Sequence, residues 1–307
     1  MTAAFIPRAF IPRTFIPYSQ LAAACASWKQ IPLAGCTPRR PLHLADKKAD
    51  WKAALATLQR FADNPGYKAP LQLQAQAALE NYWDWQAAAQ EACHLLIYGV
   101  DLGLSGYVLR PVYLETVALW KDAAAVAVHA RASMGHATGA DYGVPAPINT
   151  RSAQYKYAVI LMALAVLLDA PEEIPAIVEQ MLVFDTDRLL DYLSAGALEL
   201  DEINETLFHP RPYGALLPFF EQLGEAEPEL LRPYLQTQYA QFHRLSPKQQ
   251  KKGGPWQGTF YWALEVSALS VLYGWDDGDL RTSPHYLADL VDFTRQRGQA
   301  GLTDEAG

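Results

Sequence analysis

The chain has 307 residues, half of them hydrophobic, and carries a net charge of −8 at pH 7. This length suggests one large or two modest domains, and the composition is that of a globular rather than a disordered protein. The acidic balance and the lack of a polybasic cluster argue against nonspecific binding to nucleic acid or to an anionic membrane.

The N-terminal segment FIPRAFIPRTFIPYS repeats Phe-Ile-Pro. Prolines at this spacing exclude a regular helix or a central strand, so we expect residues 1–44 to form a flexible, irregular tail. Cys25, Cys36 and Cys93 are too few and too scattered for a disulfide framework or a zinc site. They fit a reducing compartment, and we expect a cytoplasmic protein; a Cys25–Cys36 bridge is the alternative for an exported chain.

Helical periodicity dominates from Asp46 onward. Residues 46–62 place their apolar side chains at helical spacing, and further helices are predicted over 71–99 and 110–133. Pro111 would lie in the first turn of the last of these, where proline is tolerated. Alternating strand patterns are nearly absent, which predicts an all-α fold, a multi-helix globular bundle.

A stretch dense in Gly and Pro, residues 134–149, predicts the main connector. It divides the chain into the tail, an N-terminal helical domain over 45–140 and a C-terminal helical domain over 141–307. The helices expected in the C-terminal domain cover 151–170, 171–184, 186–196, 214–223, 228–243, 261–275 and a last segment after Tyr286.

The acidic charge is concentrated in one window. Residues 169–229 carry 15 acidic and 2 basic side chains, whereas residues 1–168 have a net charge of +5 and residues 230–307 are neutral. Because a surface of one sign attracts and orients a partner of the opposite sign, this window predicts a binding face for a basic partner. The alternative is a solvated surface that only keeps the protein soluble.

Glu265 is the single charged residue between positions 260 and 275. On a helical wheel it lies on a bulky apolar face, opposite a stripe of small residues that another helix can approach closely. That stripe consists of Ala263, Ser267, Ser270 and Gly274. A lone buried carboxylate is costly, so we expect a basic residue and a hydroxyl to satisfy Glu265 and thereby fix the docking of a buried helix. A catalytic acid is the alternative.

The stretch FYWALEVSALSVLYGWDD, followed by TSPHYLADLVDF, resembles the C-terminal signature of PoNi immunity proteins. These helical proteins neutralise PoNe-type DNase toxins of bacterial antagonism systems, including type VI secretion. The residues that carry the resemblance are Tyr261, Trp262, Glu265, Asp276, Asp277, Pro284 and Tyr286. The resemblance implies a helical inhibitor whose partner is a nuclease toxin.

No catalytic constellation is recognisable in the sequence. The seven histidines form no metal-binding motif, and three aspartates at 185, 187 and 191 are more typical of a capped helix start than of a cation site. We therefore expect no enzymatic activity, no metal and no cofactor. Two other classes are open: a helical scaffold or adaptor, and an α-helical enzyme that uses Glu265 and Asp276.

The leading hypothesis is that the acidic window binds a nuclease, whose Lys and Arg side chains hold phosphates. The predicted partner-binding residues are Glu172, Glu173, Asp185, Asp187, Asp191, Glu199, Asp201, Glu202 and Glu205, with Tyr192 and Phe208 as apolar anchors. Alternatively, the protein could inhibit the toxin by covering a surface that the toxin needs for assembly, without touching the active site. No direct contact with nucleic acid or membrane is expected, and the protein is predicted to be a monomer or a homodimer.

Overall fold

The computed structural model describes residues 19–39, 44–63, 75–138, 146–200, 202–221, 228–243 and 261–304. These residues form helices joined by turns, with no β-strand among them, which confirms the predicted all-α fold. The Phe-Ile-Pro repeats lie outside the described residues. No helix in the described ranges has both the length and the apolar character needed to cross a bilayer.

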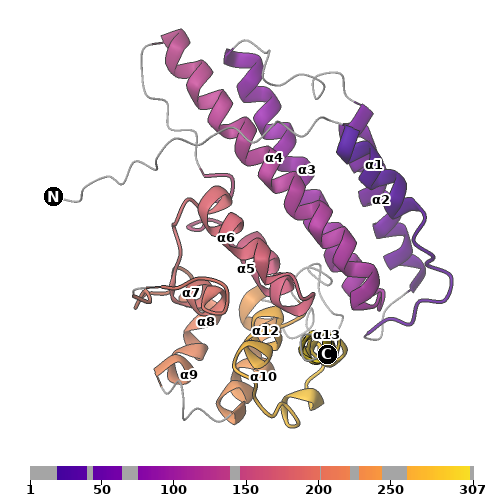
Figure 1. The fold of residues 1–307 in the computed structure, drawn as a ribbon, viewed down its shortest axis with the longest axis vertical. Helices are drawn as coiled ribbons and strands as arrows, with labels where there is room; N and C mark the ends of the chain where they lie inside the picture. The colour runs from indigo at the N-terminus through magenta and orange to yellow at the C-terminus, as the bar shows by residue number, and fades with distance from the viewer. Residues whose placement is uncertain are drawn as a thin grey trace.

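The N-terminal half is a layer of long helices. Its elements are α1 (Ser19–Lys29), α2 (Leu44–Asp63), α3 (Ala75–Asp101) and α4 (Gly106–Thr138). In Figure 1, α3 and α4 run side by side as the longest pair, and α1 and α2 flank them on one side. Tryptophans fill the layer, since Trp28, Trp51, Trp85 and Trp120 are each at most 1% exposed. Burial of Trp51, Ala54, Leu55 and Leu58 along one face of α2 confirms the periodicity read from the sequence.

The expected irregular segment up to residue 44 is wrong for residues 19–29, which form α1. This helix buries Leu21, Cys25 and Trp28 in the core and contacts α2 and α4. Proline restricts only its own residue, the one before it and the turn it interrupts, so the Ala-rich run that follows the repeats is free to become helical. All three cysteines are free.

Arg39, between α1 and α2, ties three parts of the chain together. Its Nη2 donates to the Leu104 carbonyl in the turn between α3 and α4 at 2.7 Å, and its Nε donates to Asp289 Oδ1 on α13 at 2.9 Å. Only 9% of its side chain is exposed. The residues after α1 are therefore packed against both halves of the molecule, contrary to the expectation of a free tail.

The C-terminal half is built around α5 (Tyr155–Leu167), a helix that is apolar on every side. A helix of this kind must be covered all round, and α5 contacts α3, α4, α7, α12 and α13. The other elements, seen in the lower part of Figure 1, are α7 (Arg188–Ser194), α8 (Pro210–Tyr213), η5 (Gly214–Leu216), α9 (Leu217–Glu221), η6 (Pro228–Leu231), α10 (Arg232–His243), α12 (Leu264–Leu272), η7 (Leu280–Thr282) and α13 (Ala288–Asp304).

Residues 171–184, predicted as one helix, form several short ones. They are the 3₁₀ turn η3 (Pro171–Glu173), α6 (Ile174–Ala176) and the π-helical turn η4 (Ile177–Met181). In the wide turn the Leu182 amide donates to the Ile177 carbonyl at 3.1 Å, five residues back. The chain then leaves the helix through Val183 and Phe184, which both have positive φ angles. Helical periodicity does not distinguish such local changes of pitch, because the apolar pattern shifts by only one residue.

Candidate functional site

Glu265 lies in the first turn of α12 and is only 2% exposed. The hydroxyl of Tyr234, on α10, donates a hydrogen bond to Glu265 Oε1. Burial raises the pKa of Glu265 to about 7, even though the Tyr234 hydrogen bond acts in the opposite direction. The hydroxyl partner predicted from the sequence is present, and the contact joins two buried helices.

The small-residue stripe of α12 faces the segment that leads into α13. Ser267 Oγ accepts from the Leu287 amide at 3.1 Å, and Ser270 Oγ forms a hydrogen bond with the Tyr286 hydroxyl. The predicted close approach is therefore present, although the chain that approaches is a turn and the residues that follow it, rather than a helix. Gly274 lies beyond the end of α12 with a positive φ of 64°.

Replacing Glu265 with glutamine is expected to flatten the pH dependence of folding. Because the pKa in the folded state is about 7 and the ordinary value is 4.5, the folded protein holds this proton over an interval in which the unfolded chain has lost it. The stabilisation is complete below pH 4.5 and is lost as the pH rises through 7, a change of about 3 kcal/mol.

Denaturant melts of wild type and Glu265→Gln at pH 5 and pH 8 measure this difference. Between pH 5 and pH 8, wild type should lose more of its free energy of unfolding than Glu265→Gln does. If the free energies of the two proteins change in parallel with pH, the raised pKa of Glu265 is contradicted. Glu265→Ala should be less stable than Glu265→Gln at both pH values, since it leaves the Tyr234 hydroxyl unpaired and opens a cavity.

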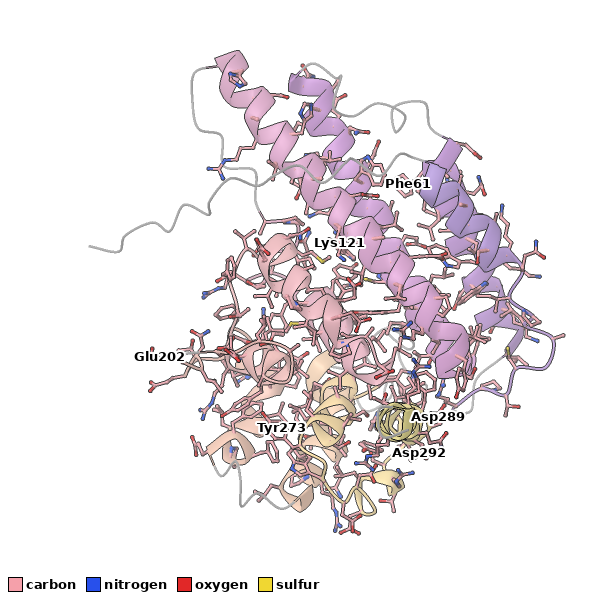
Figure 2. All side chains as sticks on the ribbon, in the orientation of Figure 1. Phe61, Lys121, Glu202, Tyr273, Asp289 and Asp292 are labelled. Carbon is pink, nitrogen blue, oxygen red and sulfur yellow. The ribbon has the colours of Figure 1, made fainter. Side chains whose placement is uncertain are left out.

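Asp277 is the centre of a second buried network. Its Oδ2 accepts from the Tyr286 hydroxyl at 2.6 Å, and its Oδ1 accepts from Arg281 Nε and from Arg295 Nη1, each at 3.0 Å. Burial alone would raise the pKa of Asp277, but these three hydrogen bonds outweigh it and hold the pKa below its ordinary value. Arg281 also pairs with Asp292 of α13, labelled in Figure 2.

Trp262 connects the C-terminal motif to the N-terminal half. Its indole Nε1 donates to Asp101 Oδ1, at the end of α3, at 3.0 Å. Tyr261 contributes its backbone carbonyl, which lies 2.6 Å from His285 Nδ1. Five of the seven motif residues therefore make contacts within the fold. They are Tyr261, Trp262, Glu265, Asp277 and Tyr286. They position α12 and α13 rather than presenting a reactive group.

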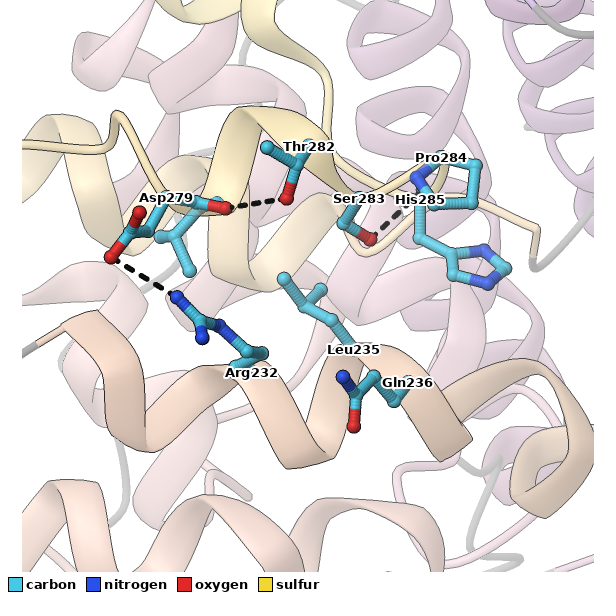
Figure 3. A pocket seen from close by; sticks show the side chains of 9 residues that line it. Arg232, Leu235, Gln236, Asp279, Thr282, Ser283, Pro284 and His285 are labelled. Carbon is cyan, nitrogen blue, oxygen red and sulfur yellow. Dashed lines mark hydrogen bonds and ion pairs between the residues drawn. The ribbon is translucent and has the colours of Figure 1, made fainter.

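The other two motif residues, Asp276 and Pro284, are exposed. Pro284 lines a shallow pocket between α10 and η7, shown in Figure 3, where Arg232 Nη2 pairs with Asp279 Oδ2 at 3.1 Å. Asp276 accepts from the Gly278 amide in a turn. Glu265 is buried beneath Tyr234 while Asp276 faces solvent, so the structure does not bring them together in an open cleft.

Within the acidic window, Glu172 and Glu173 form ion pairs with α4. Glu172 Oε1 lies 3.3 Å from Arg110 Nη2, and Lys121, labelled in Figure 2, donates from Nζ to Glu173 Oε2. The Glu173 side chain is 19% exposed and that of Glu172 is 58% exposed. These carboxylates hold the start of the short-helix segment against the N-terminal half, and Glu172 is the more accessible of the two.

Asp187 and Asp191 are buried, which corrects the prediction that they face a partner. Asp187 caps α7: its Oδ1 accepts from the Leu190 amide at 3.1 Å and from the Tyr155 hydroxyl at 2.9 Å. Asp191 Oδ2 accepts from the Asn204 amide at 2.7 Å. The number of charges in a sequence window does not indicate which carboxylates face solvent and which face the core.

Asp185 is partly exposed and is held by Thr150 and by Arg151, whose Nη2 lies 3.0 Å from its Oδ1. Burial raises the pKa of Asp185, but hydrogen bonds from Arg151 and Thr150 have the larger combined effect and lower it. The aspartates at 185, 187 and 191 thus have separate partners. Among the described residues, no group of three His, Cys, Asp or Glu side chains is arranged to hold a metal ion.

The two predicted aromatic anchors also pack within the fold. Tyr192 is buried, with its ring stacked 4.3 Å from that of Phe220 and its hydroxyl donating to the Phe220 carbonyl. Phe208 is half-buried, and the Arg151 guanidinium lies 3.4 Å above its ring centre. Tyr192 is therefore a core residue, which corrects its prediction as a contact.

Three predicted contact residues face solvent on the loop after α7. Glu199, Glu202 and Glu205 are exposed, and we call these three the acidic loop. Asp201, between them in sequence, lies outside the described residues. Figure 2 shows Glu202 at the outer edge of the molecule, on the side away from α3 and α4. The structure thus leaves a smaller set of free carboxylates than the sequence predicts.

Two family models match this chain on either side of α5. A model described as PA2201 N-terminal domain-like matches residues 17–138, and one described as PoNe immunity proteins (PoNi), C-terminal, matches residues 185–290. The first match includes α1, and the second includes α7, the acidic loop, α12 and the residues of the Asp277 network as far as Leu290.

A comparison with curated proteins finds no match. Among solved structures, the crystal structure of protein PA2201 from Pseudomonas aeruginosa is 49% identical in sequence, with a TM-score of 0.82. The alignment covers 91% of this chain and 98% of PA2201. With this identity and coverage, the chain belongs to the same family as PA2201, and its residues 185–290 match the C-terminal domain of PoNe immunity proteins.

Proposed function

We propose that this protein neutralises a PoNe-type nuclease by binding it through the acidic loop. The observation that carries the proposal is that the match to PoNe immunity proteins spans the acidic loop, whose carboxylates are exposed. A nuclease holds its substrate with Lys and Arg side chains, and carboxylates on an inhibitor can occupy the positions of the phosphates.

We also propose which kind of toxin the protein meets and in which compartment it acts. The toxin would be a DNase delivered by an antagonism system such as type VI secretion, and the immunity protein would meet it in the cytoplasm, where the DNA is. The narrower identity that we predict for this chain is a protein of the TsiT kind, a type VI immunity protein. Binding needs no cofactor, no catalysis and no contact with nucleic acid, and the proposed complex forms from a monomer or a homodimer.

The alternative of an enzyme that uses Glu265 and Asp276 has little support in the geometry. One carboxylate is sealed beneath Tyr234, and the other lies in an exposed turn, where it accepts from a backbone amide. A scaffold or adaptor role is distinguished by experiment, because an immunity protein rescues cells from its toxin through a stable complex and a scaffold does not.

The test is co-expression with a PoNe-type nuclease, to be sought in the reading frames beside the gene for this chain. Wild type is expected to restore growth and to co-purify with an inactivated nuclease. Reversing charge at the acidic loop, with Glu199, Glu202 and Glu205 all changed to Lys, should slow association at low salt about tenfold or more and reduce its dependence on salt. Stopped-flow binding at several salt concentrations measures both effects.

A matched control changes the same amount of charge elsewhere. Asp46, Asp63 and Glu80 are exposed on α2 and α3, and their triple replacement by Lys should slow association much less. Equal slowing by both triple variants would show that only net charge matters, and unchanged kinetics in the acidic-loop variant would remove this loop from the mechanism. Absence of rescue and of a complex with wild type would refute the proposed function itself.

A further inference from the structure

The turn after η4 presents two apolar side chains to solvent in an unfavourable backbone conformation. Val183 has φ +52° and is 52% exposed, and Phe184 has φ +59° and is 58% exposed. Left-handed φ angles are uncommon for any residue other than glycine and rare for a β-branched one. A solvent-exposed turn would ordinarily place Gly or Asn at such positions.

The surrounding structure holds this turn from both sides. The Phe184 amide donates to the Val178 carbonyl at 3.0 Å, and the Asp185 amide donates to the Leu182 carbonyl at 3.0 Å. On the following residue, the Asp185 carboxylate is clamped by Arg151. These flanking contacts therefore fix the conformation of the turn, in which the side chains of Val183 and Phe184 are exposed to solvent. Strain held in this way is typical of binding and functional sites.

Apolar exposure is concentrated in the stretch of chain that begins at this turn. Of the seven large apolar side chains that are exposed in the described part of the chain, four lie between positions 183 and 203: Val183, Phe184, Leu200 and Ile203. The two segments that carry them are joined, since the Arg188 amide donates to the Thr206 carbonyl at 2.9 Å. Asn204 also donates from Nδ2 to Asp191 at 2.8 Å.

Exposed carboxylates lie close in sequence to these apolar residues. Glu179 on η4 is exposed, as are Glu202 and Glu205 of the acidic loop. An apolar centre with a charged rim is the usual anatomy of a protein interface, in which a few buried aromatic anchors supply most of the affinity and the rim sets the rate and the choice of partner.

We propose that Val183 and Phe184 are the apolar anchors with which this protein holds a basic nuclease. They would enter an apolar pocket on the partner that is bordered by Lys and Arg side chains. The inference rests on the proposed function and adds to it the residues that keep the complex together after the charges have brought the partners into contact.

Charge decides which partner fits this surface. In a symmetric dimer the same patch faces itself, so the carboxylates at 179, 202 and 205 of one copy would oppose those of the other. Like charges at close range disfavour that arrangement, whereas Lys and Arg on a nuclease complement it. A basic protein therefore fits this face better than a second copy of the chain.

The test measures binding of the same nuclease, in an inactivated form, to Val183→Ala and Phe184→Ala. Phe184→Ala should weaken binding about 30-fold or more and Val183→Ala about tenfold, in both cases mainly through faster dissociation. The association rate should change little, in contrast with charge reversal at the acidic loop. Val128→Ala and Trp83→Ala are matched controls, because these side chains are 50% and 47% exposed on the N-terminal half, and they should bind as wild type does.

The outcomes separate this inference from the function on which it rests. If wild type binds and Phe184→Ala binds equally well, the anchors are refuted while the inhibitor role stands. If wild type does not bind the nuclease, both fall together. If wild type is a dimer in sedimentation experiments and Phe184→Ala is a monomer, the face belongs to a second copy of the chain and the nuclease assignment is wrong. Thermal melts of each variant confirm that it is folded.

Discussion

Changing Gly103 to alanine is expected to lower the free energy of unfolding by about 3 kcal/mol or more. Gly103 follows α3 with a positive φ of 76°, and a Cβ atom there would lie 2.0 Å from the carbonyl oxygen of Thr37. Two costs therefore add: the strained backbone of any other residue, and displacement of the segment that carries Arg39. Urea denaturation measures the loss.

Gly274 provides the control for this substitution. It has a similar φ of 64°, but a Cβ atom there would meet nothing within 4 Å. Gly274→Ala should therefore cost only the backbone strain, about 1 kcal/mol. Equal losses for the two variants would mean that the contact with Thr37 does not limit the position of the turn.

The second large effect is expected at Asp277. Replacing it with alanine leaves the buried Tyr286 hydroxyl without this acceptor and takes away a carboxylate that pairs with Arg281 and Arg295, so we expect a loss of about 3 kcal/mol. Tyr286→Phe removes the hydrogen bond to Asp277 and the one with Ser270, and it should cost about 1 to 2 kcal/mol. Chemical denaturation at pH 7 compares the two variants with wild type.

The pH dependence identifies the ionised form as the stabilising one. The folded-state pKa of Asp277 is below its ordinary value of 3.8, so its contribution is complete above pH 3.8 and is lost as the pH falls through the lowered pKa. Wild type should have a higher free energy of unfolding than Asp277→Asn near neutral pH, and this difference should disappear in that acidic range. An advantage that persists in strong acid would show that packing, not charge, accounts for the difference.

Local sequence patterns predicted the elements well where one periodic face decides them. The apolar spacing of 46–62 identified α2, and the single carboxylate at 265 predicted a buried helix with a basic and a hydroxyl partner, of which the Tyr234 hydroxyl is present. Both inferences depend on residues within one or two helical turns. The resemblance to PoNi proteins, carried by about 30 residues, agrees with the match of residues 185–290 to the model of the PoNi C-terminal domain.

Contacts between distant residues were not predictable in this way. Nothing near Asp101 in the sequence indicates that it accepts from Trp262, and nothing near Arg39 indicates a partner on α13. For the candidate site, the charge window was visible but burial within it was not, so Asp187 and Asp191 were assigned to the surface. The outward turn at Val183 and Phe184 was read as the end of a regular helix because its signal is a backbone angle, which composition does not encode.

The bond from Arg39 to Asp289 has a consequence for how the protein is made. The two residues are 250 positions apart, and Trp262 and Asp101 are 161 apart. The first half of the chain emerges from the ribosome long before the residues that complete these bonds are translated. The nascent N-terminal helices therefore form before Arg39 and Asp101 can reach these two partners, and both bonds can form only when α13 has left the exit tunnel.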